Sequence, residues 1–155
     1  MARRILTFAG LLALTLAAPA AQAQITSPPP AGTTHLYTVP GVVNAGNLAT
    51  YLTCTSVSTA SQTITVDVFS QTGASAGSAT SVLGAGKSMR FGTQASPALL
   101  VDTLITTTPV ASGVARIVST DKKLLCTAAV ADATSGSPVM AELTIVAKLK
   151  QKAAN

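Results

Sequence analysis

The nine residues from Gln62 to Ser70, Gln-Thr-Ile-Thr-Val-Asp-Val-Phe-Ser, decide the fold class of this chain. Apolar and polar side chains alternate along them, with Ile64, Val66 and Val68 set against Thr63, Thr65 and Asp67. A period of two places one set on each face of an extended strand, and β-branched residues favour that backbone. The stretch therefore predicts a β-strand with one face in a core and the other in solvent.

The same alternation recurs on both sides of this stretch. It marks residues 49–57, 87–93, 114–119, 124–130 and 142–150, with shorter candidates at 36–39, 80–83 and 100–105. Gly, Asn and Ser clusters separate these segments, and no segment after residue 23 carries a helical stripe. Seven or eight such strands predict an all-β fold, an antiparallel β-sandwich of immunoglobulin-like architecture. A small β-barrel is the alternative.

Two cysteines, Cys54 and Cys126, lie on an early and a late predicted strand, and each shares a face with apolar residues. Two cysteines allow one intramolecular bridge, and an oxidising compartment favours its formation. We therefore predict a structural disulfide that joins the two sheets of the sandwich. A loop of about 72 residues would give it roughly 4 kcal/mol of stabilisation. Two buried thiols or a redox-active pair are the alternatives.

The N-terminus has the three parts of a secretory signal peptide. Arg3 and Arg4 precede an uncharged stretch rich in Leu and Ala, and Ala21-Gln22-Ala23 offers a small-residue cleavage site. We expect cleavage after Ala23 and a periplasmic or extracellular protein; an uncleaved anchor is the alternative. The predicted organisation is a signal peptide at 1–23, a Pro-rich flexible arm at 24–34, one β domain at 35–150 and a frayed tail at 151–155.

Composition argues against several classes of function. Only 10% of the residues are charged, 3% are aromatic and a single histidine, His35, is present. A catalytic base needs partners, yet few carboxylates accompany it: Asp67, Asp102, Asp121, Asp132 and Glu142. Zinc and calcium sites need ligand clusters that this chain lacks. The sequence therefore predicts no catalytic residues, no metal and no cofactor.

Four lysines form a candidate basic patch: Lys122, Lys123, Lys148 and Lys150. Such a patch attracts anionic envelope polymers or lipid headgroups. The alternative is an edge strand that its lysines protect from pairing with other chains. Nucleic-acid binding would need more positive charge than the formal +5 and more aromatic residues for stacking, so we expect none. We also expect no transmembrane segment once the signal peptide has been removed.

Several stretches resemble small exported, uncharacterised bacterial proteins of the all-β class. They are residues 37–42 (Tyr-Thr-Val-Pro-Gly-Val), 53–55 (Thr-Cys-Thr), 113–119 (Gly-Val-Ala-Arg-Ile-Val-Ser) and 125–128 (Leu-Cys-Thr-Ala). The resemblance implies a sandwich in a bacterial envelope or extracellular setting. It implies no activity and supplies no catalytic residue.

These observations predict a non-catalytic exported module that binds a protein or an envelope polymer. A structural subunit of a surface layer or fibre is the alternative, because low-charge strands suit assembly through strand pairing. An enzyme with an unusual site is the third hypothesis. The identity of the ligand and the oligomeric state remain open.

Overall fold

The computed structural model of the protein describes residue 25 and residues 27–147. Within this part of the chain it contains ten β-strands and no helix, which confirms the all-β prediction. The strands are β1 (Thr34–Ala45), β2 (Leu48–Ser56), β3 (Gln62–Ser70), β4 (Ser75–Leu83), β5 (Ser88–Gly92), β6 (Thr103–Leu104), β7 (Val110–Ser119), β8 (Leu124–Asp132), β9 (Met140–Glu142) and β10 (Val146–Ala147).

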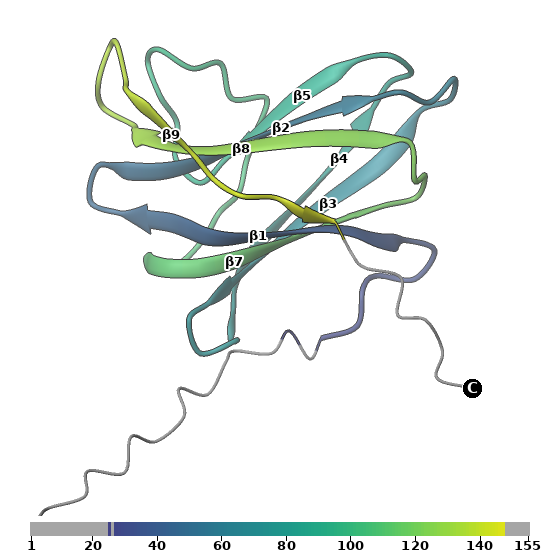
Figure 1. The fold of residues 1–155 in the computed structure, drawn as a ribbon, viewed down its shortest axis with the longest axis horizontal. Helices are drawn as coiled ribbons and strands as arrows, with labels where there is room; N and C mark the ends of the chain where they lie inside the picture. The colour runs from purple at the N-terminus through teal and green to yellow at the C-terminus, as the bar shows by residue number, and fades with distance from the viewer. Residues whose placement is uncertain (1–24, 26, 148–155) are drawn as a thin grey trace, which may run out of the picture.

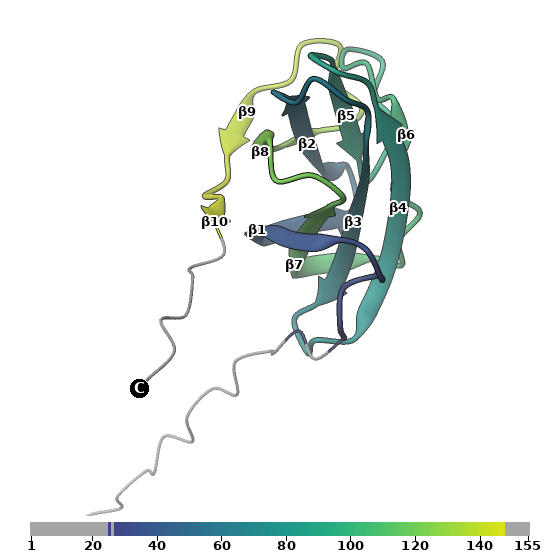
Figure 2. The same cartoon turned by 90° about the vertical axis from the view of Figure 1, so that its right-hand side faces the viewer.

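Seven strands form one continuous sheet in the order β4-β3-β7-β1-β2-β5-β6, and this sheet curls into a nearly closed barrel (Figure 2). The predicted sandwich of two separate sheets is therefore wrong. The hairpin between β1 and β2 keeps the sheet continuous where it bends, because Asn44 pairs with Ala49 and Ala45 pairs with Leu48. The sheet is also mixed, because β5 and β6 run parallel.

The barrel closes where β4 meets the segment that follows β6. Gly77 forms a bridge with Thr107, and the Thr108 N–H donates to the Ala76 carbonyl at 2.9 Å. A Cβ atom on Gly77 would lie 2.2 Å from the carbonyl oxygen of Thr106. Only glycine lets the two backbones approach this closely, so this residue makes the closure possible.

The last described part of the chain crosses from β8 to β1 (Figure 1). β8 pairs with β2 along its whole length, β9 pairs with β8, and β10 pairs with β1. The single strand predicted at 142–150 is thus two short strands, and residues 148–150 lie outside the described residues. Leu143 lies between these strands and approaches Gly41 of β1.

The barrel interior follows the alternation of the sequence. The inward set is fully or largely buried and includes Val39, Leu52, Cys54, Ile64, Val66, Val68, Leu83, Phe91, Ile105, Ala115, Ile117 and Leu124. A smaller cluster lies on the outer face of β2 and β8, where Ala49, Tyr51 and Ala131 pack under Leu99 and Val101. The predicted division of faces is therefore confirmed for the central strands.

Candidate functional site

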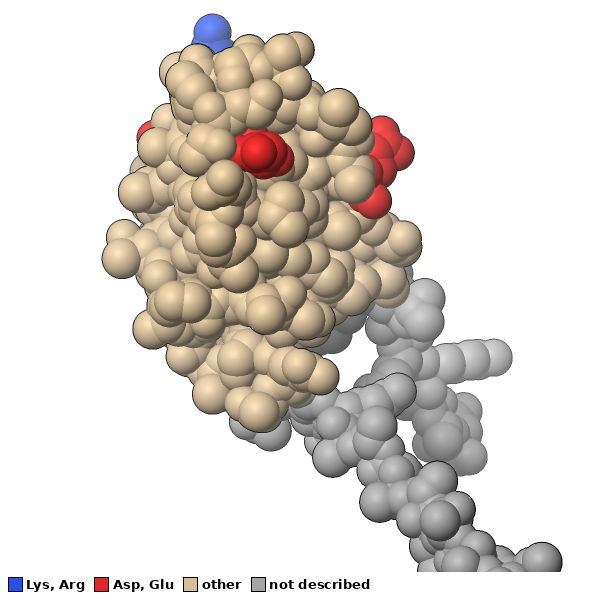
Figure 3. All heavy atoms as spheres, turned by 90° about the vertical axis from the view of Figure 1, so that its left-hand side faces the viewer, with Lys and Arg blue, Asp and Glu red and all other residues tan. Residues whose placement is uncertain are grey.

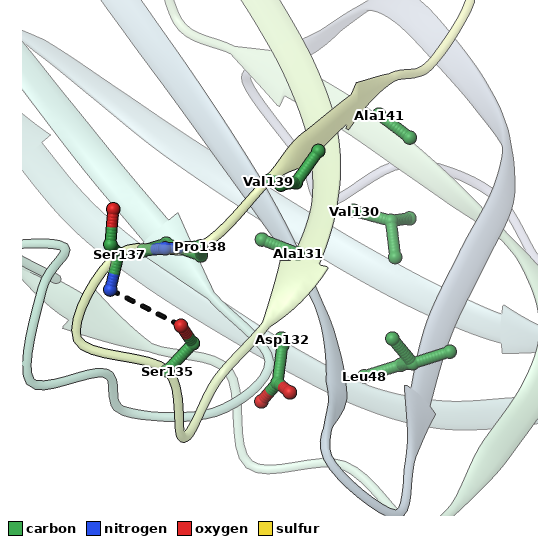
Figure 4. Close-up of a pocket in the computed structure, with 9 residues that line it drawn as sticks. All are labelled: Leu48, Val130, Ala131, Asp132, Ser135, Ser137, Pro138, Val139 and Ala141. Carbon is green, nitrogen blue, oxygen red and sulfur yellow. Dashed lines mark hydrogen bonds between the residues drawn. The ribbon is translucent and has the colours of Figure 1, made fainter.

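An apolar groove of about 530 Å³ opens at the end of the barrel where β2 begins and β8 ends (Figure 4). Its lining comes from Leu48, from Val130 to Asp132, and from the segment that leads through Pro138 and Val139 into β9. Leu48 pairs with Asp132, and Val130 pairs with Ala141, so these side chains share the face that continues into the core. These side chains lie on the same face of β2 and β8 as the inward residues Leu52 and Ala128, beyond the end of the buried core.

Large apolar side chains remain in water around this groove. Of the side chains that line it, Val139 is 90% exposed and Leu48 is 48% exposed. Single exposed apolar residues are common on protein surfaces, whereas apolar residues gathered around a concavity mark binding surfaces. This arrangement makes the groove the candidate ligand site.

Asp132 is the one charged residue among the described residues that line the groove. The Thr134 backbone N–H and hydroxyl donate to its Oδ1 at 2.8 and 2.7 Å. These hydrogen bonds, the hydroxyl first, lower the pKa of Asp132, so its carboxylate is ionised at neutral pH. The groove therefore carries a fixed negative charge at one end.

Figure 3 views the molecule from the groove end of the barrel. Uncharged residues make up most of this face, acidic side chains are visible on it, and a basic side chain is visible only at its upper tip. The charged side chains that the described residues show on this face are thus mainly acidic, although the chain as a whole has a formal charge of +5.

Cys54 and Cys126 form the predicted disulfide, with Cα atoms 4.1 Å apart. The bridge does not join two sheets, because the two residues face each other on the adjacent strands β2 and β8. On β8 the carbonyls of Leu124 and Ala128 face away from β2, toward Tyr37 and Leu143. By alternation, Cys126 also turns its backbone away from β2, which leaves Cys54 and Cys126 as a close, non-hydrogen-bonded pair.

The candidate basic patch is only partly within the described residues. Lys122 and Lys123 are exposed in the predicted turn between β7 and β8, whereas Lys148 and Lys150 lie outside the described residues. Asp121 shares this turn and accepts a hydrogen bond from the Ser58 hydroxyl at 2.6 Å, which lowers the pKa of Asp121. A structural role in the turn accounts for this carboxylate.

His35 and Asp102 both make local contacts. The Nε2 atom of His35 lies 3.0 Å from the Tyr37 carbonyl and 3.1 Å from the Thr38 hydroxyl, both on its own strand. Asp102 accepts a hydrogen bond from the Arg90 backbone N–H at 2.7 Å. Within the described ranges, no three His, Cys, Asp or Glu residues could together hold a metal ion.

Arg116 forms a buried cluster that the sequence analysis did not single out. It is 4% exposed on the outer face of β7, and its guanidinium contacts Asp67 at 2.7 Å, the one ion pair among the described residues. The same guanidinium lies 5.3 Å from the Phe69 ring centroid and donates to the carbonyls of Ser27 and Pro28. The signal in the sequence was the alternation of β3 and β7. It places Asp67 and Arg116 on the outer face, while the residues on either side of them point into the barrel.

The Pro-rich segment reaches Arg116 through a tight turn. The Thr33 N–H donates to the Pro30 carbonyl at 3.1 Å, and Gly32 has a φ of 76°. This geometry is typical of a type II turn, which needs a residue with positive φ at its third position. Part of the predicted arm is therefore held against the barrel by its carbonyl groups.

Tyr51 contains a buried hydroxyl without a hydrogen-bond partner among the described residues. The side chain is 1% exposed under the segment between β5 and β6. Burial raises the pKa of Tyr51 and the charge of Asp132 adds to this shift, whereas the Ser96 side chain offsets part of it, although it does not meet the geometry of a hydrogen bond to the phenol. The phenol is thus strongly favoured in its neutral form.

Comparisons with protein-family models, with curated proteins and with solved structures found no match to this chain. Among the residues that the structure describes, there is no helix of the length and hydropathy needed to cross a membrane.

Proposed function

We propose that this protein is an exported, non-catalytic binding module whose groove takes an apolar ligand. The observation that carries the proposal is an open, mostly apolar groove at the end of the barrel, with exposed Val139 and Leu48 on its wall. Covering such side chains removes apolar surface from water, which contributes roughly 25 cal/mol per Å². A ligand that fills the groove would therefore bind through the hydrophobic effect.

Export is part of this proposal. The three-part pattern of residues 1–23 supports it, and a disulfide between Cys54 and Cys126 is typical of oxidising compartments. The resemblance to small exported bacterial proteins agrees with a periplasmic or extracellular location. In that setting the natural ligand would be an apolar part of an envelope component or of another exported protein.

The test is a fluorescence titration with N-phenyl-1-naphthylamine, an uncharged probe that brightens in apolar sites. The oxidised protein is expected to bind it saturably at one site. Val139→Ser should weaken binding several-fold, because it removes apolar contact from the groove wall. Val57→Ser is the matched control, since Val57 is 54% exposed just beyond the opposite end of β2.

Two results would overturn the proposal. One is the absence of saturable binding to the folded, oxidised protein. The other is an equal loss of affinity in the Val139→Ser and Val57→Ser variants, which would assign the signal to unspecific adsorption on exposed apolar residues.

A structural subunit is the second candidate, and the edge of β9 favours it. Leu143 donates its N–H to Ala128 of β8, so by alternation Met140 and Glu142 turn their backbone groups away from β8. Such an edge can accept a strand from another chain. Sedimentation velocity should then show a ladder of oligomers that grows with concentration, and Met140→Pro should abolish it.

A further inference from the structure

We propose that the groove selects a small amphipathic cation, with the apolar part of the ligand against Leu48 and Val139 and its positive head beside Asp132. This inference rests on the proposed function and adds the chemistry of the ligand. Its first support is the lining itself, which is apolar apart from Ser135, Ser137 and Asp132. A purely apolar ligand would leave the carboxylate without a counter-charge at the edge of a desolvated surface.

The second support is the position of Asp132. It belongs to the last pair of the β2–β8 ladder, opposite Leu48, so it lies beside the apolar wall (Figure 4). The hydrogen bonds from Thr134 hold the carboxylate in place without neutralising it. A positive group at this end of the groove would therefore meet a preorganised anion.

The third support is the distribution of charge. Among the described residues the one ion pair joins Arg116 to Asp67, on other strands, so no basic side chain of this part of the chain neutralises Asp132. Basic side chains are also scarce on the face shown in Figure 3. A cationic ligand would supply a counter-charge that the described residues do not, and an anionic amphipath of equal length would be repelled.

The experiment measures displacement of N-phenyl-1-naphthylamine by decyltrimethylammonium and by decyl sulfate, both far below their micelle concentrations. These probes share a ten-carbon chain and carry opposite charges. The cation is expected to bind at least threefold more tightly than the anion, and its affinity should fall as salt is added.

Asp132→Asn is the decisive variant, because asparagine keeps an oxygen that can accept from Thr134 and removes only the charge. It should weaken decyltrimethylammonium binding about threefold and leave binding of the uncharged probe unchanged. Asp121→Asn is the matched control, since Asp121 is also a turn carboxylate held by a hydroxyl. It should change neither affinity.

The outcomes separate the two proposals. Equal affinity for the cation and the anion, or equal effects of Asp132→Asn and Asp121→Asn, would overturn the cation preference and leave the apolar site intact. Failure of the uncharged probe to bind would overturn both. If Asp132→Asn does not fold, the salt dependence and the cation–anion ratio of the unaltered protein still decide the question.

Discussion

Replacement of Arg116 by alanine is expected to lower the free energy of unfolding by about 3 kcal/mol, because it leaves a partly buried carboxylate without its cation. Arg116 is 4% exposed, and the side chain of Asp67 is 15% exposed. Breaking a buried pair costs about 3–5 kcal/mol. We take the lower end because Asp67 keeps some contact with water and a hydrogen bond from Ser78 at 2.8 Å.

The same variant should release the Pro-rich segment. In the unaltered protein, the guanidinium donates to the carbonyls of Ser27 and Pro28, and charge-assisted hydrogen bonds are stronger than neutral ones. Removing residues 24–30 from a chain of residues 24–155 should therefore cost about 1–2 kcal/mol. The same truncation in the Arg116→Ala background should cost almost nothing.

Urea unfolding followed by far-UV circular dichroism, with the disulfide intact, measures all four free energies of this cycle. Arg90→Ala is the control, because Arg90 is only half-buried and its guanidinium forms no ion pair within the described residues, while its backbone hydrogen bond to Asp102 survives the substitution. It should cost less than about 1 kcal/mol. Costs of truncation and of Arg116→Ala that add to within about 0.5 kcal/mol would refute the coupling between the arm and the guanidinium.

Three further predictions concern the barrel itself. Joint replacement of Cys54 and Cys126 by alanine should lower the free energy of unfolding by about 4 kcal/mol. The native far-UV circular dichroism spectrum should stay unchanged, because the β2–β8 ladder persists. Loss of the β signal in buffer without denaturant would contradict this. Tyr51→Phe should raise the free energy of unfolding by about 1 kcal/mol, since it removes a buried, unpaired hydroxyl. The folded pKa of Tyr51 is raised above the usual tyrosine value of about 10, so the native protein should lose stability as the pH rises past that value, and this loss should shrink in the Tyr51→Phe variant. A stability difference between the two proteins that does not change with pH would be the contrary result. Gly77→Ala should cost at least about 2 kcal/mol and speed hydrogen exchange across the barrel closure, whereas Gly136→Ala, with no atom within 4 Å of the new Cβ, should do neither.

The face of each central strand could be predicted from alternation alone. Ile64, Val66 and Val68 point into the barrel because a period of two leaves no other arrangement that buries them together. The turns at residues 84–87 and 119–123 followed from Gly, Ser and Asp at positions between strands. These features are local, so a single sequence contains them.

The closure of the barrel could not be predicted in the same way. It depends on a bridge between Gly77 and Thr107, two positions 30 residues apart that carry no local signal of contact. The disulfide shows the same limit. Alternation placed Cys54 and Cys126 on inward faces, but it does not say whether two strands are neighbours or lie across the core.

The groove was also beyond the sequence analysis, because it is assembled from the start of β2, the end of β8 and the approach to β9. Only Asp132 among its residues was a candidate for chemistry, and its place at a strand end gave it a sufficient structural reason. Neither the composition nor the periodicity of the sequence indicates that Val139 is exposed. Such a site becomes visible only when the strand pairing is known.

The chain has few charged residues, so the contacts that each carboxylate makes help to identify the one that could bind a ligand. Asp67 is neutralised by Arg116, Asp102 accepts a hydrogen bond from the Arg90 backbone, and Asp121 holds the turn between β7 and β8. Glu142 is exposed on β9 and does not line the groove. Asp132 also accepts local hydrogen bonds, yet it alone among the five lines the groove where apolar side chains remain in water. If binding at this groove depends on charge, Asp132→Asn must reveal it, because no other charged residue described in the structure lies in the lining.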